Sequence, residues 1–124
     1  MDIPILYQDA SILIIDKPAG IFMHPNQYTQ NKPNCLNILG GIVQKKVLTC
    51  HRLDRRTSGA VVFALRKDAA SDITTQFKER RVKKCYLALV RGHLTEEVHT
   101  DRPIRDFYSK EKKMLEAESI IRPR

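Results

Sequence analysis

A polar loop at residues 51–59 separates two apolar runs, and this arrangement restricts the fold most strongly. The runs at residues 47–50 and 60–65 are short and bounded by polar residues, which is the pattern of β-strands. The second run is continuously apolar, which predicts a strand buried on both faces. Because a rigid pair of strands can present the loop between them, we expect residues 51–59 to carry the function.

The loop holds a single carboxylate among many cations. Between residues 45 and 67 there are seven lysines and arginines and one acidic residue, Asp54. Nearby positive charge favours the ionised form of a carboxylate. Asp54 is therefore either an ion-pair partner of Arg52, Arg55 or Arg56, or a nucleophile or base aimed at an electrophile. The residues themselves leave these two alternatives open.

The composition indicates one small globular domain with a basic surface. The chain has 124 residues, 42% of them hydrophobic and 29% charged, which suits one soluble domain over residues 1–124. A net charge of +8 indicates either a polyanionic partner or a surface kept basic for solubility. The first residues lack the basic start and apolar core expected of a signal peptide, and no apolar run is long enough to span a membrane. Three cysteines without a CxxC pair predict the reducing cytoplasm.

The remaining segments predict an α+β fold. Two segments have the apolar spacing of helices, at residues 35–46 after the capping residue Asn34 and from the capping residue Asp68 to residue 80. Further strands are predicted where apolar runs or alternation occur, at residues 5–7, 12–15, 84–92 and 114–121, with residues 101–103 interrupting a weak strand. This order predicts a mixed, largely antiparallel sheet with flanking helices.

Four segments together resemble one enzyme family. Residues 51–59, His-Arg-Leu-Asp-Arg-Arg-Thr-Ser-Gly, resemble the HRLD-x-x-TSG signature of the pseudouridine synthases of the RluA class. Asp-Lys-Pro-Ala-Gly at 16–20 followed by His24-Pro25, and Phe77 with the K-x-Y-x-A-x-V-x-G run at 84–92, resemble two other segments of the family. The sequences Val-Arg-Gly at 90–92 and Asp-Arg-Pro-Ile at 101–104 are most similar to the branch called tRNA pseudouridine synthase C.

The resemblance implies an RNA-modifying isomerase without a cofactor. Such enzymes break the N1–C1′ bond of uridine, turn the base and rejoin it through C5. On this basis Asp54 is the essential catalytic aspartate, and Tyr86 stacks on the target base and assists loss of the C5 proton. Arg52 would fill the place that the base leaves in the stack. By residue pattern alone, Tyr86 suits a core position and Arg52 an ion pair with Asp54.

RNA is the expected partner, with tRNA preferred and ribosomal RNA as the alternative. Besides Arg52, the cations expected to contact RNA are Arg55, Arg56, Lys83, Lys84 and Arg91, although each suits a solvated surface equally well. Lys17, just before a turn, is assigned only a weak RNA contact.

No metal is expected. His24, Cys35, Cys50 and His51 have spacings that match no zinc-ligand pattern, and the cysteines suit buried thiols better.

The sequence departs from the family at its C-terminal end. The family's catalytic domain carries a later Gly-Arg-x-His-Gln-Ile-Arg-type segment, whose basic residue is expected to pair with the aspartate, and this chain has none. The N-terminal S4 module common in relatives is also missing. Two alternatives follow. Either the chain is a fragment of a full synthase, or it is a short protein that does not catalyse. In the second case it binds RNA, or it binds a second chain through an unpaired sheet edge.

Overall fold

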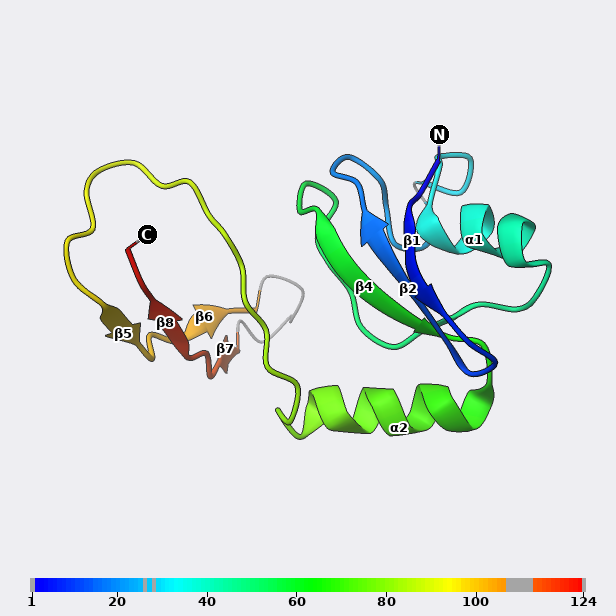
Figure 1. The fold of residues 1–124 in the computed structure, drawn as a ribbon. Coiled ribbons are helices and arrows are strands. Elements are labelled where there is room, and N and C mark those ends of the chain that lie inside the picture. Colours follow the sequence, from blue (N-terminus) through cyan, green and yellow to red (C-terminus); the bar gives the residue numbers. More distant parts are fainter. Residues whose placement is uncertain (1, 26, 28, 107–112, 124) are drawn as a thin grey trace. The chain divides into compact units, whose positions relative to one another are not determined.

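The structure, a computed structural model, describes residues 2–25, 27, 29–106 and 113–123 (Figure 1). The chain divides into two compact units, an N-terminal unit, Met1–Lys84, and a C-terminal unit, Cys85–Arg124. The N-terminal unit contains both helices and the four-stranded sheet.

The sheet of the N-terminal unit is antiparallel throughout. Its strands are β1 (Ile5–Gln8), β2 (Ile12–Lys17), β3 (Leu48–Thr49) and β4 (Gly59–Ala64), in the order β1-β2-β4-β3. The predicted pairing of the first two strands through a tight turn is confirmed. The Asp9 carboxylate fixes that turn, because one of its oxygens accepts from the backbone N–H groups of Ser11 (2.7 Å) and Ile12 (2.8 Å).

The first helix, α1 (Cys35–Val43), begins where the sequence predicts and ends three residues earlier. The side chain of Asn34 accepts a hydrogen bond of 3.0 Å from the backbone N–H of Asn37, which confirms the predicted cap. Gln44 follows the helix with a left-handed backbone (φ 50°), and this conformation stops the helix before Lys45 and Lys46.

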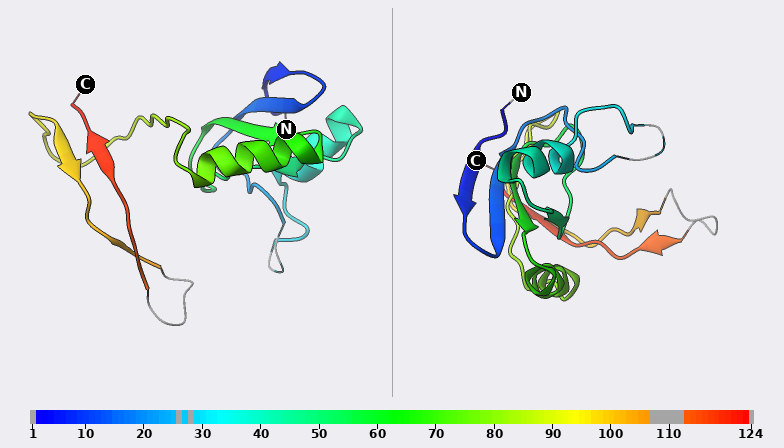
Figure 2. Two further views of the ribbon diagram at one scale, coloured as in Figure 1. Left: turned by 90° about the horizontal axis from the view of Figure 1, so that it is seen from below. Right: turned by 90° about the vertical axis from the view of Figure 1, so that its right-hand side faces the viewer.

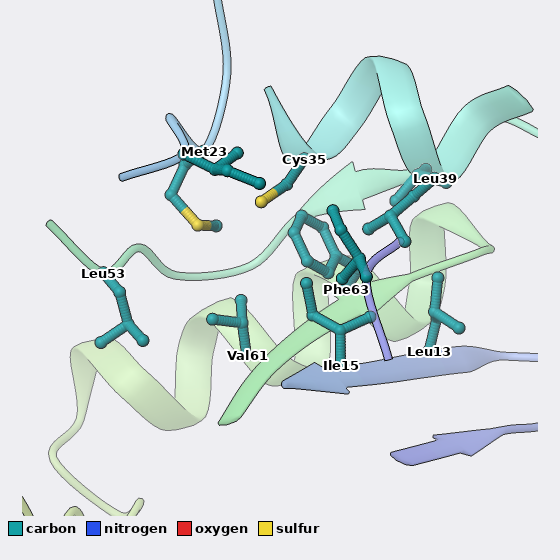
Figure 3. Close-up of a cluster of buried hydrophobic side chains, with 11 residues drawn as sticks. Leu13, Ile15, Met23, Cys35, Leu39, Leu53, Val61 and Phe63 are labelled. Atoms are coloured by element: carbon teal, nitrogen blue, oxygen red, sulfur yellow. The ribbon is translucent and has the colours of Figure 1, made fainter. Parts of the chain in front are cut away.

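The core lies between α1 and one face of the sheet. Alternate residues of the two central strands point toward the helix, Leu13 and Ile15 from β2 and Val61 and Phe63 from β4. Figure 3 shows them packed with Cys35 and Leu39 of α1. On the other face of β4, Val62 is half-buried and Ala60 is exposed. The prediction that this strand is buried on both faces is therefore wrong, because its second face is only partly covered.

The second helix, α2 (Lys67–Lys78), contacts β4 and β3, at the end of the sheet away from β1 (Figure 2). Asp68 does not cap it: the extended residue before the helix is Arg66, which provides no side-chain cap. Asp68 instead lies in the first turn and pairs with the Arg66 guanidinium, and a carboxylate there is favoured by the helix dipole. The predicted cap is therefore wrong by two residues.

The C-terminal unit contains two short antiparallel ladders. β5 (Val98–Thr100) pairs with β8 (Ser119–Ile121), and β6 (Ile104–Arg105) pairs with β7 (Met114–Leu115). The single strand predicted at residues 114–121 is thus two strands, because residues 116–118 leave the ladder. The interruption predicted at residues 101–103 separates β5 from β6.

The strand predicted at residues 84–92 is not formed. Its alternating side chains are solvent-exposed on both sides, with Leu87 at 78% and Leu89 fully exposed. A strand needs a neighbouring backbone to hydrogen-bond, and none of the described strands pairs with this segment. The predicted α+β class with antiparallel sheets is nevertheless confirmed. Within the described ranges, no helix is long and apolar enough to cross a membrane.

Candidate functional site

Asp54 lies in the loop between β3 and β4, with its side chain exposed. The carbonyl oxygen of Asp54 accepts a hydrogen bond of 3.1 Å from the backbone N–H of Thr57, which closes a turn around the residue. The preceding side chain, Leu53, is buried in the core cluster. The loop is therefore anchored by an apolar side chain and presents a carboxylate to solvent.

The buried side chain of Lys17 hydrogen-bonds to the backbone of this loop. Its ammonium group donates to the carbonyl oxygens of Thr57 (2.7 Å), Pro18 (3.1 Å) and Arg55 (3.3 Å). The Lys17 side chain is fully buried, because it lies on the same face of β2 as Leu13 and Ile15. A buried ammonium is tolerated only when it is hydrogen-bonded, and the loop carbonyls meet that need.

The charge at the site also acts on the buried ammonium. Burial lowers the pKa of Lys17, and the negative charge of Asp54 opposes that change. The weak RNA contact predicted for Lys17 is wrong, since its side chain does not reach the surface. The sequence did indicate that Lys17 is buried, because it lies two residues after Ile15 and four after Leu13, on the same face of the predicted strand if that strand extends to residue 17.

Arg55 forms a second tether between the loop and the segment after β2. Its side-chain Nε donates to the carbonyl oxygen of Gly20 (2.9 Å), and the N–H of Gly20 donates to the carbonyl oxygen of Arg55 (2.7 Å). The Arg55 guanidinium also lies 4.9 Å from the centre of the Phe22 ring. Gly20 has a φ of +94°, a conformation that L side chains rarely adopt, so this turn depends on glycine.

His51 is a structural residue of the loop. Its Nε2 accepts a hydrogen bond of 3.0 Å from the N–H of Val62, and its ring stacks on Phe77 with centroids 4.2 Å apart. Burial lowers the pKa of His51, and the charge of Lys84 lowers it further. The neutral ring therefore carries its proton on Nδ1, and it joins the start of the loop to the last turn of α2.

The ion-pair alternative for Asp54 has no geometric support. Among the residues that the structure describes, no ion pair joins its carboxylate to Arg52, Arg55 or Arg56. Arg55 is instead directed to Gly20, and Arg52 and Arg56 are exposed. An exposed carboxylate on a tethered loop, with cations around it, suits a nucleophile or base that acts on a polyanionic substrate.

The remaining predicted residues lie outside the Asp54 loop. Lys84 ends the N-terminal unit, and Tyr86 and Arg91 are exposed residues of the C-terminal unit. Cys35 and Cys50 are buried free thiols, and burial raises the pKa of each. Over residues 2–25, 27, 29–106 and 113–123 there is no cluster of three histidine, cysteine or acidic side chains that would hold a metal ion.

The chain is similar to known RNA-modifying proteins along most of its length. The profile described as RNA pseudouridylate synthase matches residues 11–122. The chain is 37% identical to tRNA pseudouridine synthase C of Pasteurella multocida over 85% of its own length and 44% of that protein. It is 40% identical to the dual-specificity RNA pseudouridine synthase RluA of Yersinia pestis, over 75% of this chain and 45% of the relative.

A solved structure has the same fold. The structure titled human RNA Pseudouridylate Synthase Domain Containing 1 superposes with a TM-score of 0.70 at 28% identity, covering 96% of this chain and 50% of the human chain. The chain thus spans about half the length of the relatives it matches.

Proposed function

The chain belongs to the RNA pseudouridylate synthase family, and we propose that it isomerises a uridine in RNA through Asp54. One observation carries this proposal: the Asp54 carboxylate is exposed and makes no ion pair with the neighbouring arginines, on a loop that Lys17 and Arg55 tether to β2 and the turn after it. A positioned, unprotonated carboxylate is what every form of attack on the uridine requires.

We assign roles to the other predicted residues on the same basis. Tyr86 stacks on the target base and assists loss of its C5 proton, and Arg52 fills the gap that the base leaves in the RNA stack. Extruding the base costs a few kcal/mol, which contacts to the neighbouring phosphates must offset. Those contacts come from cations of the loop and of the chain beyond it, namely Arg55, Arg56, Lys84 and Arg91.

We take tRNA as the substrate and ribosomal RNA as the alternative. The name tRNA pseudouridine synthase C belongs to several relatives that are 33–37% identical to this chain. The three free cysteines suit the reducing cytoplasm, where we place the activity.

The test is to incubate the chain with unmodified tRNA and to quantify pseudouridine by mass spectrometry of the digested RNA. We expect product with the unchanged chain and none with Asp54→Asn, which removes the charge but keeps the shape. Asp72→Asn is the matched control, because Asp72 is an exposed acid on α2 and should leave the yield unchanged. Product from the Asp54→Asn variant would overturn the proposal.

A second candidate is an RNA-binding protein that does not catalyse. It is favoured by one observation: Tyr86, like Leu87 and Leu89 beside it, is exposed in a segment that pairs with none of the described strands, so no sheet fixes the side chain that the enzyme would stack on the base. This candidate predicts tRNA binding that weakens with salt, no pseudouridine, and an affinity that Asp54→Asn leaves unchanged. The same incubation, accompanied by a binding measurement, separates it from the enzyme.

A further inference from the structure

The C-terminal end of α2 carries a dense group of cations. Five of the seven residues from 78 to 84 are basic and all five are exposed: Lys78, Arg80, Arg81, Lys83 and Lys84. The one acid among them, Glu79, pairs with Arg81, whose Nε lies 2.7 Å from the carboxylate. Among the described residues no ion pair involves Arg80, Lys83 or Lys84, and we call these three the α2-end cations.

Arg80 occupies a backbone position that normally belongs to glycine. Its φ is +56°, its N–H donates to the carbonyl oxygen of Phe77 (3.2 Å), and the N–H of Arg81 donates to that of Gln76 (2.9 Å). These two bonds form a Schellman motif, in which the left-handed residue is usually glycine because a Cβ is disfavoured there. The backbone conformation therefore does not explain an arginine at this position. The guanidinium of Arg80 is instead available to bind a ligand.

The α2-end cations adjoin the loop that bears Asp54. Phe77, on the last turn of α2, stacks on the ring of His51 with centroids 4.2 Å apart, and His51 is three residues before Asp54. Lys84 lies close enough to His51 for its charge to act on that ring. The end of α2 is therefore fixed beside the base of the loop rather than placed elsewhere on the unit.

We propose that Arg80 extends the contacts expected of Lys83 and Lys84 into one phosphate-binding surface, which holds the RNA backbone beside the Asp54 loop. This inference rests on the proposed function, because it takes RNA as the partner. Neutralising phosphates with lysine and arginine releases counterions, so each contact raises affinity and steepens its dependence on salt. Cations at the end of α2, which the Phe77–His51 stacking fixes beside the loop, thus orient the strand before the uridine is extruded.

The test uses two single variants and a control pair. Arg80→Gly removes the guanidinium and relaxes the backbone, and Lys83→Ala removes one ammonium. The control is the double variant Lys45→Ala/Lys46→Ala, in the segment just before β3. β3 pairs with the end of β4 that leads into α2, so the control cations lie toward the other end of this helix, about 18 Å long.

Binding of a fluorescent RNA hairpin is measured by anisotropy over a salt series, and stability by urea unfolding. Arg80→Gly and Lys83→Ala should each weaken binding about three- to tenfold at low salt, and each should reduce the slope of log affinity against log salt by about 0.7–0.9. The control pair should change affinity less than about twofold, because it touches no phosphate in this proposal. The urea midpoint of Arg80→Gly should equal or exceed that of the unchanged chain, so weaker binding cannot be attributed to unfolding.

The outcomes separate this inference from the proposed function. If Arg80→Gly and Lys83→Ala bind like the unchanged chain while pseudouridine is still made, the surface is refuted and the proposed function stands. If the control pair weakens binding as much as they do, general charge is responsible and the surface is again refuted. If no pseudouridine forms but the two variants lose affinity selectively, the surface stands without the enzyme.

Discussion

The ammonium group of Lys17 donates a hydrogen bond of 2.7 Å to the carbonyl oxygen of Thr57, 40 residues further along the chain. This bond joins the end of β2 to the loop that presents Asp54. Burying an ammonium is costly, and the bonds to three carbonyls offset that cost only while the loop keeps its shape. The stability of the unit and the geometry of the candidate site are therefore linked through one side chain.

Replacing this ammonium should destabilise the protein. Lys17→Met keeps the length of the side chain but leaves the carbonyls of Arg55 and Thr57 without their donor. We expect the free energy of unfolding to fall by about 1–3 kcal/mol, as measured by urea denaturation. Lys45→Met is the matched control, since Lys45 is exposed, and it should change stability by less than about 0.5 kcal/mol. Equal urea midpoints for both variants would show that the Lys17 tether contributes nothing.

Replacing Asp54 should leave stability unchanged. An aspartate held in an ion pair would stabilise the fold, whereas the described structure places no ion pair on Asp54 and leaves only the longer-range attraction of its charge to the buried Lys17 ammonium. We therefore expect Asp54→Asn to alter the free energy of unfolding by less than about 0.5 kcal/mol, measured under the same denaturation conditions. A clearly larger loss would restore the salt-bridge interpretation that the sequence left open.

Local sequence patterns predicted some elements correctly and failed at two others. The hairpin of β1 and β2 and the Asn34 cap of α1 depend on neighbouring residues, and both are confirmed. The Asp68 cap failed because an acid in the first turn and an acid at the cap position look alike in sequence, and only the backbone of Arg66 distinguishes them. The segment at residues 84–92 failed because alternation does not provide a partner strand.

The candidate site was predicted in part. The motif located Asp54 and its loop, but it did not reveal what holds the loop in place. The tethers from Lys17 and Arg55 join residues 35–40 positions apart, and such contacts depend on how β2 and β4 pair. The role of His51 is likewise set by its stacking on Phe77, which sequence spacing does not indicate.

Gly59 should be required for the end of the loop. It begins β4 opposite Lys17 and has a φ of +122°, while an added Cβ would meet no atom within 4 Å. The cost of Gly59→Ala is therefore backbone strain alone, about 1–3 kcal/mol in thermal or urea unfolding. Gly41→Ala is the opposite case: Gly41 lies inside α1, where its Cβ would also meet nothing, so alanine should stabilise by about 0.5–1 kcal/mol. Equal effects of the two substitutions would contradict the strain at Gly59.

The neutral ring of His51 should make stability depend on pH below neutrality. Burial, aided by the charge of Lys84, lowers the pKa of His51 in the folded state, whereas the unfolded chain keeps a value of about 6.5. Below about pH 6.5 the unfolded state therefore binds more protons than the folded state, so the stabilisation present at higher pH is lost as the pH falls toward and through the folded pKa. Urea unfolding at about pH 7.5 and about pH 5.5 should show this loss. In His51→Gln, whose amide oxygen can still accept from the Val62 N–H, the loss should be smaller; an unchanged pH dependence would exclude His51 as its source.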